Sequence, residues 1–226
     1  MHKSYIVNQQ YIKSKSYNKI ILKSHFLIPI VKNINNVLYK YIKGYKIELN
    51  YIFQGAIMEL FISEAEIEDA AMIIEYLNQI GGESDFLQFG KNECYLNEFE
   101  EMEIIQDYQK QDNSLLLLGF IDDELVSILS IKGEQQARLK HIGHFAITVK
   151  KEYWHMSIAT AMMEEMLEMI QNTSLKILDL EVRSDNTNAI KLYKKFNFKE
   201  IGVYPKMIQI DNHFYDTILM NLYLEK

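Results

Sequence analysis

The chain has 226 residues, of which 48% are hydrophobic, 24% charged and 12% aromatic, and its formal net charge is −7. This composition excludes a disordered chain and predicts a globular protein with a sizeable core. No apolar run approaches the ~20 residues that a membrane-spanning helix needs, and the acidic total disfavours nucleic-acid binding by charge alone. The single cysteine, Cys94, excludes an intramolecular disulfide and predicts a reducing, cytoplasmic location.

Charge divides the chain into two parts. Residues 1–57 contain nine lysines and one acid, Glu48, whereas residues 58–226 contain 15 basic and 30 acidic residues. The first part has no sustained period, so we expect a basic, poorly structured extension followed by one domain over 58–226. One interpretation of the extension is an arm for membrane surfaces or nucleic acid. The other, which we favour, is that translation starts at Met58, because the codons for Gln54-Gly55-Ala56 can contain a ribosome-binding sequence.

Strands and helices alternate from residue 58 onward. The predicted elements are strand 59–62, a helix ended by Gly81-Gly82, helix 97–110, strands 115–121 and 125–131, strand 138–149, helix 157–170, strand 176–183, helix 187–196, and strands 198–210 and 214–224. Ser63 and Glu66 form the expected capping box of the first helix. Its expected buried face is Ile67, Ala70, Ala71, Ile74 and Leu77. The order β-α-α-β-β-β-α-β-α-β-β predicts an α/β (α+β) fold, a mixed central sheet with helices on both faces.

A turn of small residues lies between the strand that ends at Val149 and the following helix. Ser157 and Ala159 are small enough to let a ligand approach the backbone. The N–H groups at the start of a helix, and the helix dipole, favour a phosphate at such a turn. An ordinary strand-to-helix connection would have the same pattern, so this turn alone does not decide the function.

Two stretches together resemble the GNAT family of acyl-CoA N-acyltransferases. The first, Trp154 to Ala159, occupies the place of that family's pyrophosphate motif, Arg/Gln-x-x-Gly-x-Gly/Ala, with Trp154 and Ser157 as departures. The second follows the motif Val-x-x-x-Asn-x-x-Ala-x-x-Leu-Tyr-x-x-x-Gly-Phe through Val182, Asn186, Ala189, Leu192, Tyr193 and Phe198. Asn197 replaces its glycine, and we expect φ > 0 there because asparagine is the next-best residue for that conformation. The resemblance covers 59–226. Within it, the stretches 81–93, 141–149 and 205–220 are similar to a bacterial subgroup of small-molecule acetyltransferases.

The resemblance implies a binding site for acetyl-CoA. The pantetheine arm would pair with the backbone of the strand from Ala146 to Val149, and the pyrophosphate would bind N–H groups of the turn. Asn186 would hydrogen-bond the arm, and capping of the next helix is its alternative role. The residues implied in cofactor binding are Ile147, Val149, Trp154, His155, Met156, Ser157, Ile158, Ala159, Thr160, Asn186 and Tyr193.

The resemblance also implies a general acid, Tyr193, which would protonate the leaving thiolate; a core tyrosine is the alternative. Attack needs a neutral amine and therefore a base or a water chain. The base candidates are Glu83, His141, His144 and Glu181. His144 lies on the predicted central strand, and an imidazole titrates near neutrality, which suits a base. Its alternative role is that of a structural histidine of the sheet. Glu83 would act as base or bind a cationic amine.

The sequence as a whole predicts a cytoplasmic N-acetyltransferase. It would move an acetyl group from acetyl-CoA to a primary amine of a small molecule by direct attack, and the acidic surface of 58–226 favours cationic amines. The alternative is a catalytically degenerate acyl-CoA-binding or dimerisation module. We expect no metal, because no Cys/His cluster has ligand spacing, and we interpret the methionines of 157–170 as core residues. A homodimer follows from the resemblance alone, and no nucleic-acid or membrane partner is expected.

Overall fold

The structure is a computed structural model that describes residues 12–16, 19–22, 27–29, 37–38, 47–53 and 56–224, with side chains from Leu60 onward. Two compact units divide the chain: residues 1–63 with 119–124, and residues 64–118 with 125–226. The candidate site lies in the second unit. In the described part of the chain, no helix is both long and apolar enough to cross a membrane.

The first unit contains short strands. They are β1 (Ile12–Ser16), β2 (Lys19–Leu22), β3 (Leu27–Pro29), β4 (Val37–Leu38), β5 (Ile47–Phe53) and most of β6 (Ala56–Glu64). β1, β2 and β3 form an antiparallel sheet, and β4, β5 and β6 pair antiparallel in that order. Much of the extension predicted to be poorly structured lies outside the described residues, so that expectation and the start at Met58 stay predictions.

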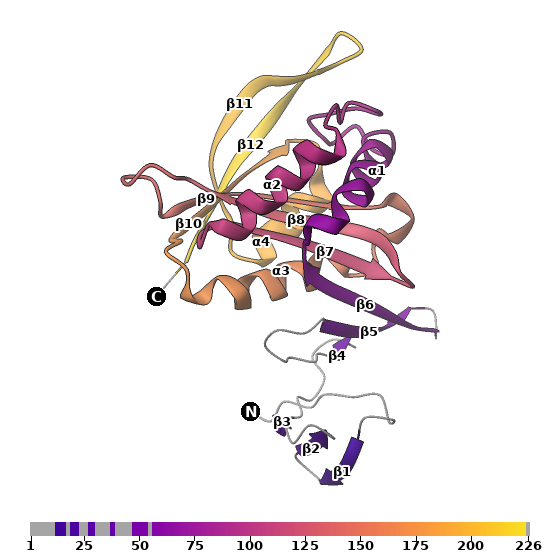
Figure 1. Ribbon diagram of the computed structural model, residues 1–226. Coiled ribbons are helices and arrows are strands. Elements are labelled where there is room, and N and C mark those ends of the chain that lie inside the picture. Colours follow the sequence, from indigo (N-terminus) through magenta and orange to yellow (C-terminus); the bar gives the residue numbers. More distant parts are fainter. Residues whose placement is uncertain are drawn as a thin grey trace. The chain divides into compact units, whose positions relative to one another are not determined.

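The elements from β6 onward follow the predicted order. They are α1 (Ala70–Ile80), α2 (Glu98–Lys110), β7 (Leu115–Ile121), β8 (Glu124–Gly133), β9 (Ile142–Val149), α3 (Ile158–Met169), β10 (Ile177–Arg183), α4 (Thr187–Lys195), β11 (Lys199–Ile210) and β12 (His213–Tyr223). Short 3-10 turns precede α1 and flank α3. The fold prediction is therefore confirmed in class and in element order (Figure 1).

The second unit is built on a mixed sheet with the strand order β11-β12-β10-β9-β8-β7. β9 and β10 are parallel and are connected through α3, whereas β8–β9, β10–β12 and β11–β12 are antiparallel pairs. Helices cover both faces of this sheet. Tyr76 of α1 contacts Thr148 on one face of β9, and Tyr193 of α4 contacts Phe145, whose side chain points to the opposite face.

The core of this unit is aliphatic and rich in methionine. Met162, Met163 and Met166 of α3 are fully buried, which confirms that these methionines are core residues. Sheet residues such as Leu129 and Ile131 of β8 are also fully buried. α3 also packs against β9, next to the turn that connects them.

Two predictions about α1 need correction. Its buried residues are Ala70, Ile73, Tyr76 and Ile80. Of the predicted face only Ala70 is fully buried, whereas Ile67, Ile74 and Leu77 are half-buried and Ala71 is exposed. The apolar residues of this helix form two overlapping stripes, and the contact of Tyr76 with the sheet selects one of them. The cap was also misplaced by three residues: the Asp69 carboxylate accepts the Glu66 N–H at 2.9 Å. The stop at Gly81 is confirmed.

The strand predicted over 138–149 is shorter in the structure. β9 begins at Ile142, because residues 136–140 form a tight turn in which the N–H groups of Leu139 and Lys140 both donate to Gln136 O. The loss of the first four residues does not affect the end of the strand, where the candidate site lies.

Candidate functional site

An opening within the sheet, between β9 and β10, is the first feature of the site. The two strands pair only from Ile177↔Ile142 to Asp179↔His144. Beyond that point, residues 145–149 of β9 and 180–183 of β10 are not paired with each other, although β9 remains paired with β8 up to Val149. The edge of β9 that faces the opening therefore offers backbone N–H and C=O groups to a ligand.

The turn after β9 is held in an unusual backbone conformation. His155 has φ 65° and Ser157 has φ 63°, both in the left-handed region that glycine adopts without strain. This explains why the pyrophosphate motif that the turn resembles has glycine at the position of Ser157. The Trp154 indole N–H donates to Val149 O at 2.8 Å and ties the turn to the end of β9.

The start of α3 provides N–H groups directly after this turn. The Ala161 N–H donates to Ser157 O, so the intrahelical hydrogen bonds begin there. The N–H groups of residues 158–160 therefore have no acceptor within the helix. α3 is 12 residues long, and its dipole favours an anion at this end. The Ser157 side chain makes no capping hydrogen bond and is exposed, so its hydroxyl is free to donate to a ligand.

A cavity of about 380 Å³ joins the opening, the turn and the helix starts. Its lining residues are Ile80, Glu83, Ser84, Phe86, Leu87, Ile147, Thr148, Val149, Tyr153, Trp154, His155, Ser157, Ile158, Ala159, Thr160, Asn186, Asn188, Ala189, Leu192 and Tyr193. The cavity thus brings together the predicted cofactor-binding residues except Met156, and of the four base candidates it contains only Glu83, since His141, His144 and Glu181 do not line it. Met156 is half-buried in the turn without lining the cavity.

α4 carries two of the predicted residues. Asn186 caps this helix, with its side-chain oxygen accepting the Ala189 N–H at 3.2 Å, and it also lines the cavity. The capping alternative is therefore confirmed, and this bond uses the amide oxygen of Asn186 and not its nitrogen. Asn197 follows α4 with φ 67°, which confirms the left-handed conformation expected there.

Tyr193 is buried, with 8% of its surface exposed, and lines the cavity. Its ring contacts Phe145 edge-on, with centroids 6.0 Å apart, and Phe198 at 5.8 Å. Burial raises the pKa of the Tyr193 phenol to about 12. The phenol is therefore a hydrogen-bond donor that stays protonated throughout the physiological pH range.

Glu83 is the one carboxylate among the residues that line the cavity. Its two oxygens accept the Lys151 N–H at 2.7 Å and the Gln79 side-chain N–H at 2.8 Å. These bonds hold the carboxylate between the end of α1 and the end of β9. Each oxygen keeps a further lone pair for a proton or an amine.

His144 lies outside the cavity, on the exposed surface of β9. Its Nδ1 is 2.8 Å from Asp179 Oδ1 and its Nε2 is 3.0 Å from Glu134 Oε1. The hydrogen bond to Glu134 is the largest cause that raises the pKa of His144, and together with the bond to Asp179 it outweighs the lowering by partial burial. Two neighbouring carboxylates stabilise the protonated imidazole, which disfavours the neutral form that a general base requires.

Sequence reasoning missed part of the cavity wall. Ala189 and Leu192 belong to the second motif; Ala189 is four residues before Tyr193 and three before Leu192, so helical spacing could have placed both in the site. Ser84, Phe86 and Leu87 come from the irregular segment after α1, and no motif or period in the sequence indicates that they face the strands. In the described part of the chain, no cluster of His, Cys, Asp or Glu side chains is placed to hold a metal ion.

Comparisons with known proteins agree with this geometry. Residues 84–198 match the profile of the acetyltransferase (GNAT) family. The L-amino acid N-acetyltransferase AaaT of Escherichia coli is 33% identical over 105 residues, which are 46% of this chain and 65%, just under two thirds, of that protein.

Solved structures agree as well. A GNAT-family acetyltransferase of Streptococcus pneumoniae matches with a TM-score of 0.71 and 31% identity, over 74% of this chain and 100% of the other. YncA of Salmonella typhimurium, a putative acetyltransferase solved with its cofactor acetyl-CoA, has the same fold, with a TM-score of 0.65 at 12% identity over 74% of this chain and 95% of the other. The opened strands, the left-handed turn and the second motif thus occur together in a chain that belongs to the GNAT family of acetyltransferases.

Proposed function

We propose that the protein transfers the acetyl group of acetyl-CoA to a primary amine of a small molecule by direct attack. The observation that carries this proposal is the single cavity in which the open edge of β9, the start of α3 and the Tyr193 phenol meet. Family membership supports the transfer chemistry. The acidic surface of residues 58–226 supports a cationic acceptor.

Acetyl-CoA is bound chiefly by backbone groups in this proposal. Its pyrophosphate lies on the N–H groups of residues 158–160 and receives a hydrogen bond from the Ser157 hydroxyl. The amide-bearing pantetheine arm pairs with the unpaired edge of β9, and the Asn186 side-chain amide donates to it. The acceptor enters beside Glu83 and Phe86, where the cavity wall is formed by the segment after α1.

The chemical step begins with the amine nitrogen attacking the thioester carbonyl carbon. A C–N bond forms, the carbonyl oxygen becomes an oxyanion, and backbone N–H groups of β9 stabilise it. The C–S bond then breaks. Glu83 takes the proton that the amine loses, CoA leaves as a thiolate, and the proton then passes from Glu83 through solvent to the CoA sulfur. We assign the base to Glu83 rather than to His144, whose two nitrogens are both engaged by carboxylates.

Tyr193 acts on the leaving sulfur by donating a hydrogen bond. A phenol has a pKa near 10 and a thiol one near 8.5 in water, so complete proton transfer from Tyr193 to the thiolate is uphill by roughly 2 kcal/mol when burial acts on both groups alike. The phenol therefore stabilises the departing thiolate while keeping its own proton for most of the step. This assigns to Tyr193 a transition-state contact that the substrate complex lacks.

The decisive experiment combines acetyl-CoA titration by calorimetry with turnover on a panel of polyamines, aminoglycosides and amino acids. We expect micromolar binding, and Tyr193→Phe is expected to lower kcat by about 100-fold without changing the Kd of acetyl-CoA. Tyr204→Phe, on an exposed strand position, is the matched control. Absence of binding by the folded protein would refute the proposal. Binding without turnover on any amine would favour the alternative, an acyl-CoA-binding module.

We further propose a cytoplasmic location and a homodimer. The unpaired thiol of Cys94 supports a reducing compartment. Exposed apolar side chains on β11 and β12, among them Val203 and Phe214, support self-association through this hairpin, which extends from the sheet (Figure 1). Sedimentation of the full chain tests the dimer, and a monomer at all concentrations would exclude it.

A further inference from the structure

A buried arginine next to the site is not used by the proposed chemistry. Arg183 ends β10, is 7% exposed and does not line the cavity. Its Nε and Nη2 donate to the two oxygens of Asp185 at 2.7 and 3.0 Å. This bidentate pair neutralises the guanidinium and fixes its plane. A side chain engaged in this way is not available to bind a substrate carboxylate.

The third contact of Arg183 reaches a distant part of the chain. Its Nη1 donates to the backbone carbonyl of Asp85 at 2.7 Å, a bond between residues 98 positions apart. Asp85 lies between Ser84 and Phe86, which both line the cavity. The bond therefore fixes the backbone of the wall at which the acceptor enters.

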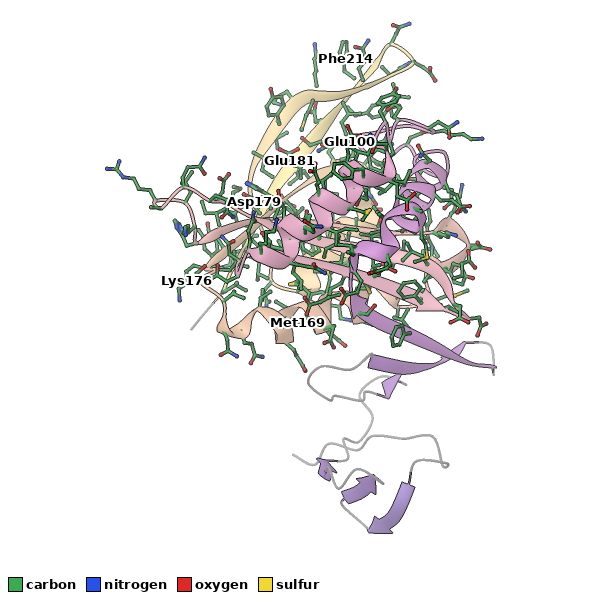
Figure 2. The ribbon with its side chains drawn as sticks, viewed as in Figure 1. Glu100, Met169, Lys176, Asp179, Glu181 and Phe214 are labelled. Carbon is green, nitrogen blue, oxygen red and sulfur yellow. The ribbon has the colours of Figure 1, made fainter. Side chains whose placement is uncertain are left out.

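Two aromatic rings enclose the guanidinium. The Phe86 ring lies 4.5 Å from its central carbon on the cavity side, and the Tyr215 ring of β12 lies 4.1 Å from it. A cation between two rings, out of water, is held by both of them. Arg183 thus connects the cavity wall to the β11–β12 hairpin, on which Phe214 is labelled in Figure 2.

A second contact ties the same wall to β10. Gln88 Nε2 donates to Glu181 Oε2 at 2.9 Å. Glu181 and Arg183 are two residues apart on the strand, so their side chains leave the same face of the sheet (Glu181 and Asp179 are labelled in Figure 2). The segment from Asp85 to Gln88 is therefore attached to β10 at both of its ends.

We propose that Arg183 is a positioning residue that holds the Ser84–Leu87 wall of the cavity, and that Tyr215 influences acceptor binding through it. The role in acceptor binding rests on the proposed function, because that function assigns this wall to the amine. The cofactor half of the cavity is formed by β9, α3 and α4. A change at Tyr215 therefore acts on the acceptor and leaves acetyl-CoA binding unaltered.

The test uses Tyr215→Leu, which removes the ring, with Tyr215→Phe as the matched control that keeps it. Asp85→Ala is a second control, because Arg183 binds only the carbonyl of Asp85. Hydrogen–deuterium exchange of peptides covering residues 83–90 reports the wall without any need for activity. We expect about 5-fold faster exchange in Tyr215→Leu and unchanged exchange in both controls. With an acceptor in hand, KM for the amine rises about 5-fold, while KM for acetyl-CoA and kcat stay the same.

Unchanged exchange at residues 83–90 in Tyr215→Leu, or an equal rise in both KM values, would overturn the proposal. If Tyr215→Leu lowers the midpoint of unfolding so far that the whole chain exchanges faster, Arg183→Lys replaces it. Lysine keeps the charge but lacks the planar fork, so the same local increase is expected. A wild-type protein without turnover refutes the proposed function, while the exchange experiment still decides whether Arg183 holds the wall.

Discussion

The left-handed conformation of Ser157 leads to a quantitative prediction for Ser157→Gly. At φ 63° a residue with a Cβ is strained by about 1–2 kcal/mol, and the Ser157 hydroxyl makes no capping bond that would offset the strain. Glycine removes the strain but loses about 0.5–1 kcal/mol of additional backbone entropy on folding. The net expectation is a stabilisation of roughly 1 kcal/mol, which raises Tm by about 3 °C in a unit of this size.

Thermal unfolding of three proteins, followed by circular dichroism or calorimetry, measures this effect. Ser157→Ala is the matched control, since alanine keeps the Cβ and its strain while losing the hydroxyl, and its Tm should stay close to that of the wild type. The same variants separate the two roles of the residue. If the Ser157 hydroxyl donates to pyrophosphate, both lose acetyl-CoA affinity by a similar factor. An equal rise of Tm in both variants, or a fall in Ser157→Gly, would refute the argument from backbone strain.

Further predictions concern stability and its pH dependence. Burial, with a smaller effect of the neighbouring Glu168, raises the pKa of Glu165 to about 7. As pH rises from about 4.5 to above 7, the free energy of unfolding of the wild type should therefore fall by on the order of 3 kcal/mol relative to that of Glu165→Gln. Urea denaturation at pH 5 and pH 8 measures this, and the same difference between the two proteins at both pH values would contradict it. The pKa of His144 is also raised, so its contribution is fully present below pH 6.5 and is lost as pH rises through the raised value; His144→Gln should therefore destabilise the protein at pH 6 and much less at pH 9, and equal losses at both pH values would rule out the ion pairs as the cause. Asn186→Ala removes a helix cap and should cost about 1 kcal/mol in chemical denaturation, whereas Asn188→Ala, two residues further along in the first turn of α4, should cost little.

The features predictable from sequence are those encoded by local conformation. Asn197 follows a short helix at a position that favours a left-handed residue, and the structure has φ 67° there. The alternation of strands and helices, the stop at Gly81 and the hairpin turns are local in the same sense. The spacing of the second motif also allowed two cavity residues to be predicted, because Asn186 and Tyr193 are seven residues apart and so lie on the same side of α4.

The features that could not be predicted depend on residues distant in sequence. The residues around Tyr76 offer two overlapping apolar stripes, and contacts with the sheet determine which one is buried, among them the contact with Thr148, 72 residues away. His144 carries no local sign of its partners, which come from 10 and 35 residues away. Arg183 stands beside a recognised motif, yet its contact with the Asp85 carbonyl exists only in the folded chain.

The parting of β9 and β10 has a consequence for how such a site can change over evolutionary time. A binding groove formed by peptide groups would contact its ligand through backbone atoms, which every amino acid possesses. Substitutions along residues 145–149 can alter the width of this groove and its hydration, yet they leave its alternating donors and acceptors in place, with proline as the exception. The side chains of the turn can thus differ from the family motif, as Trp154 and Ser157 do, while the edge of β9 keeps its peptide donors and acceptors.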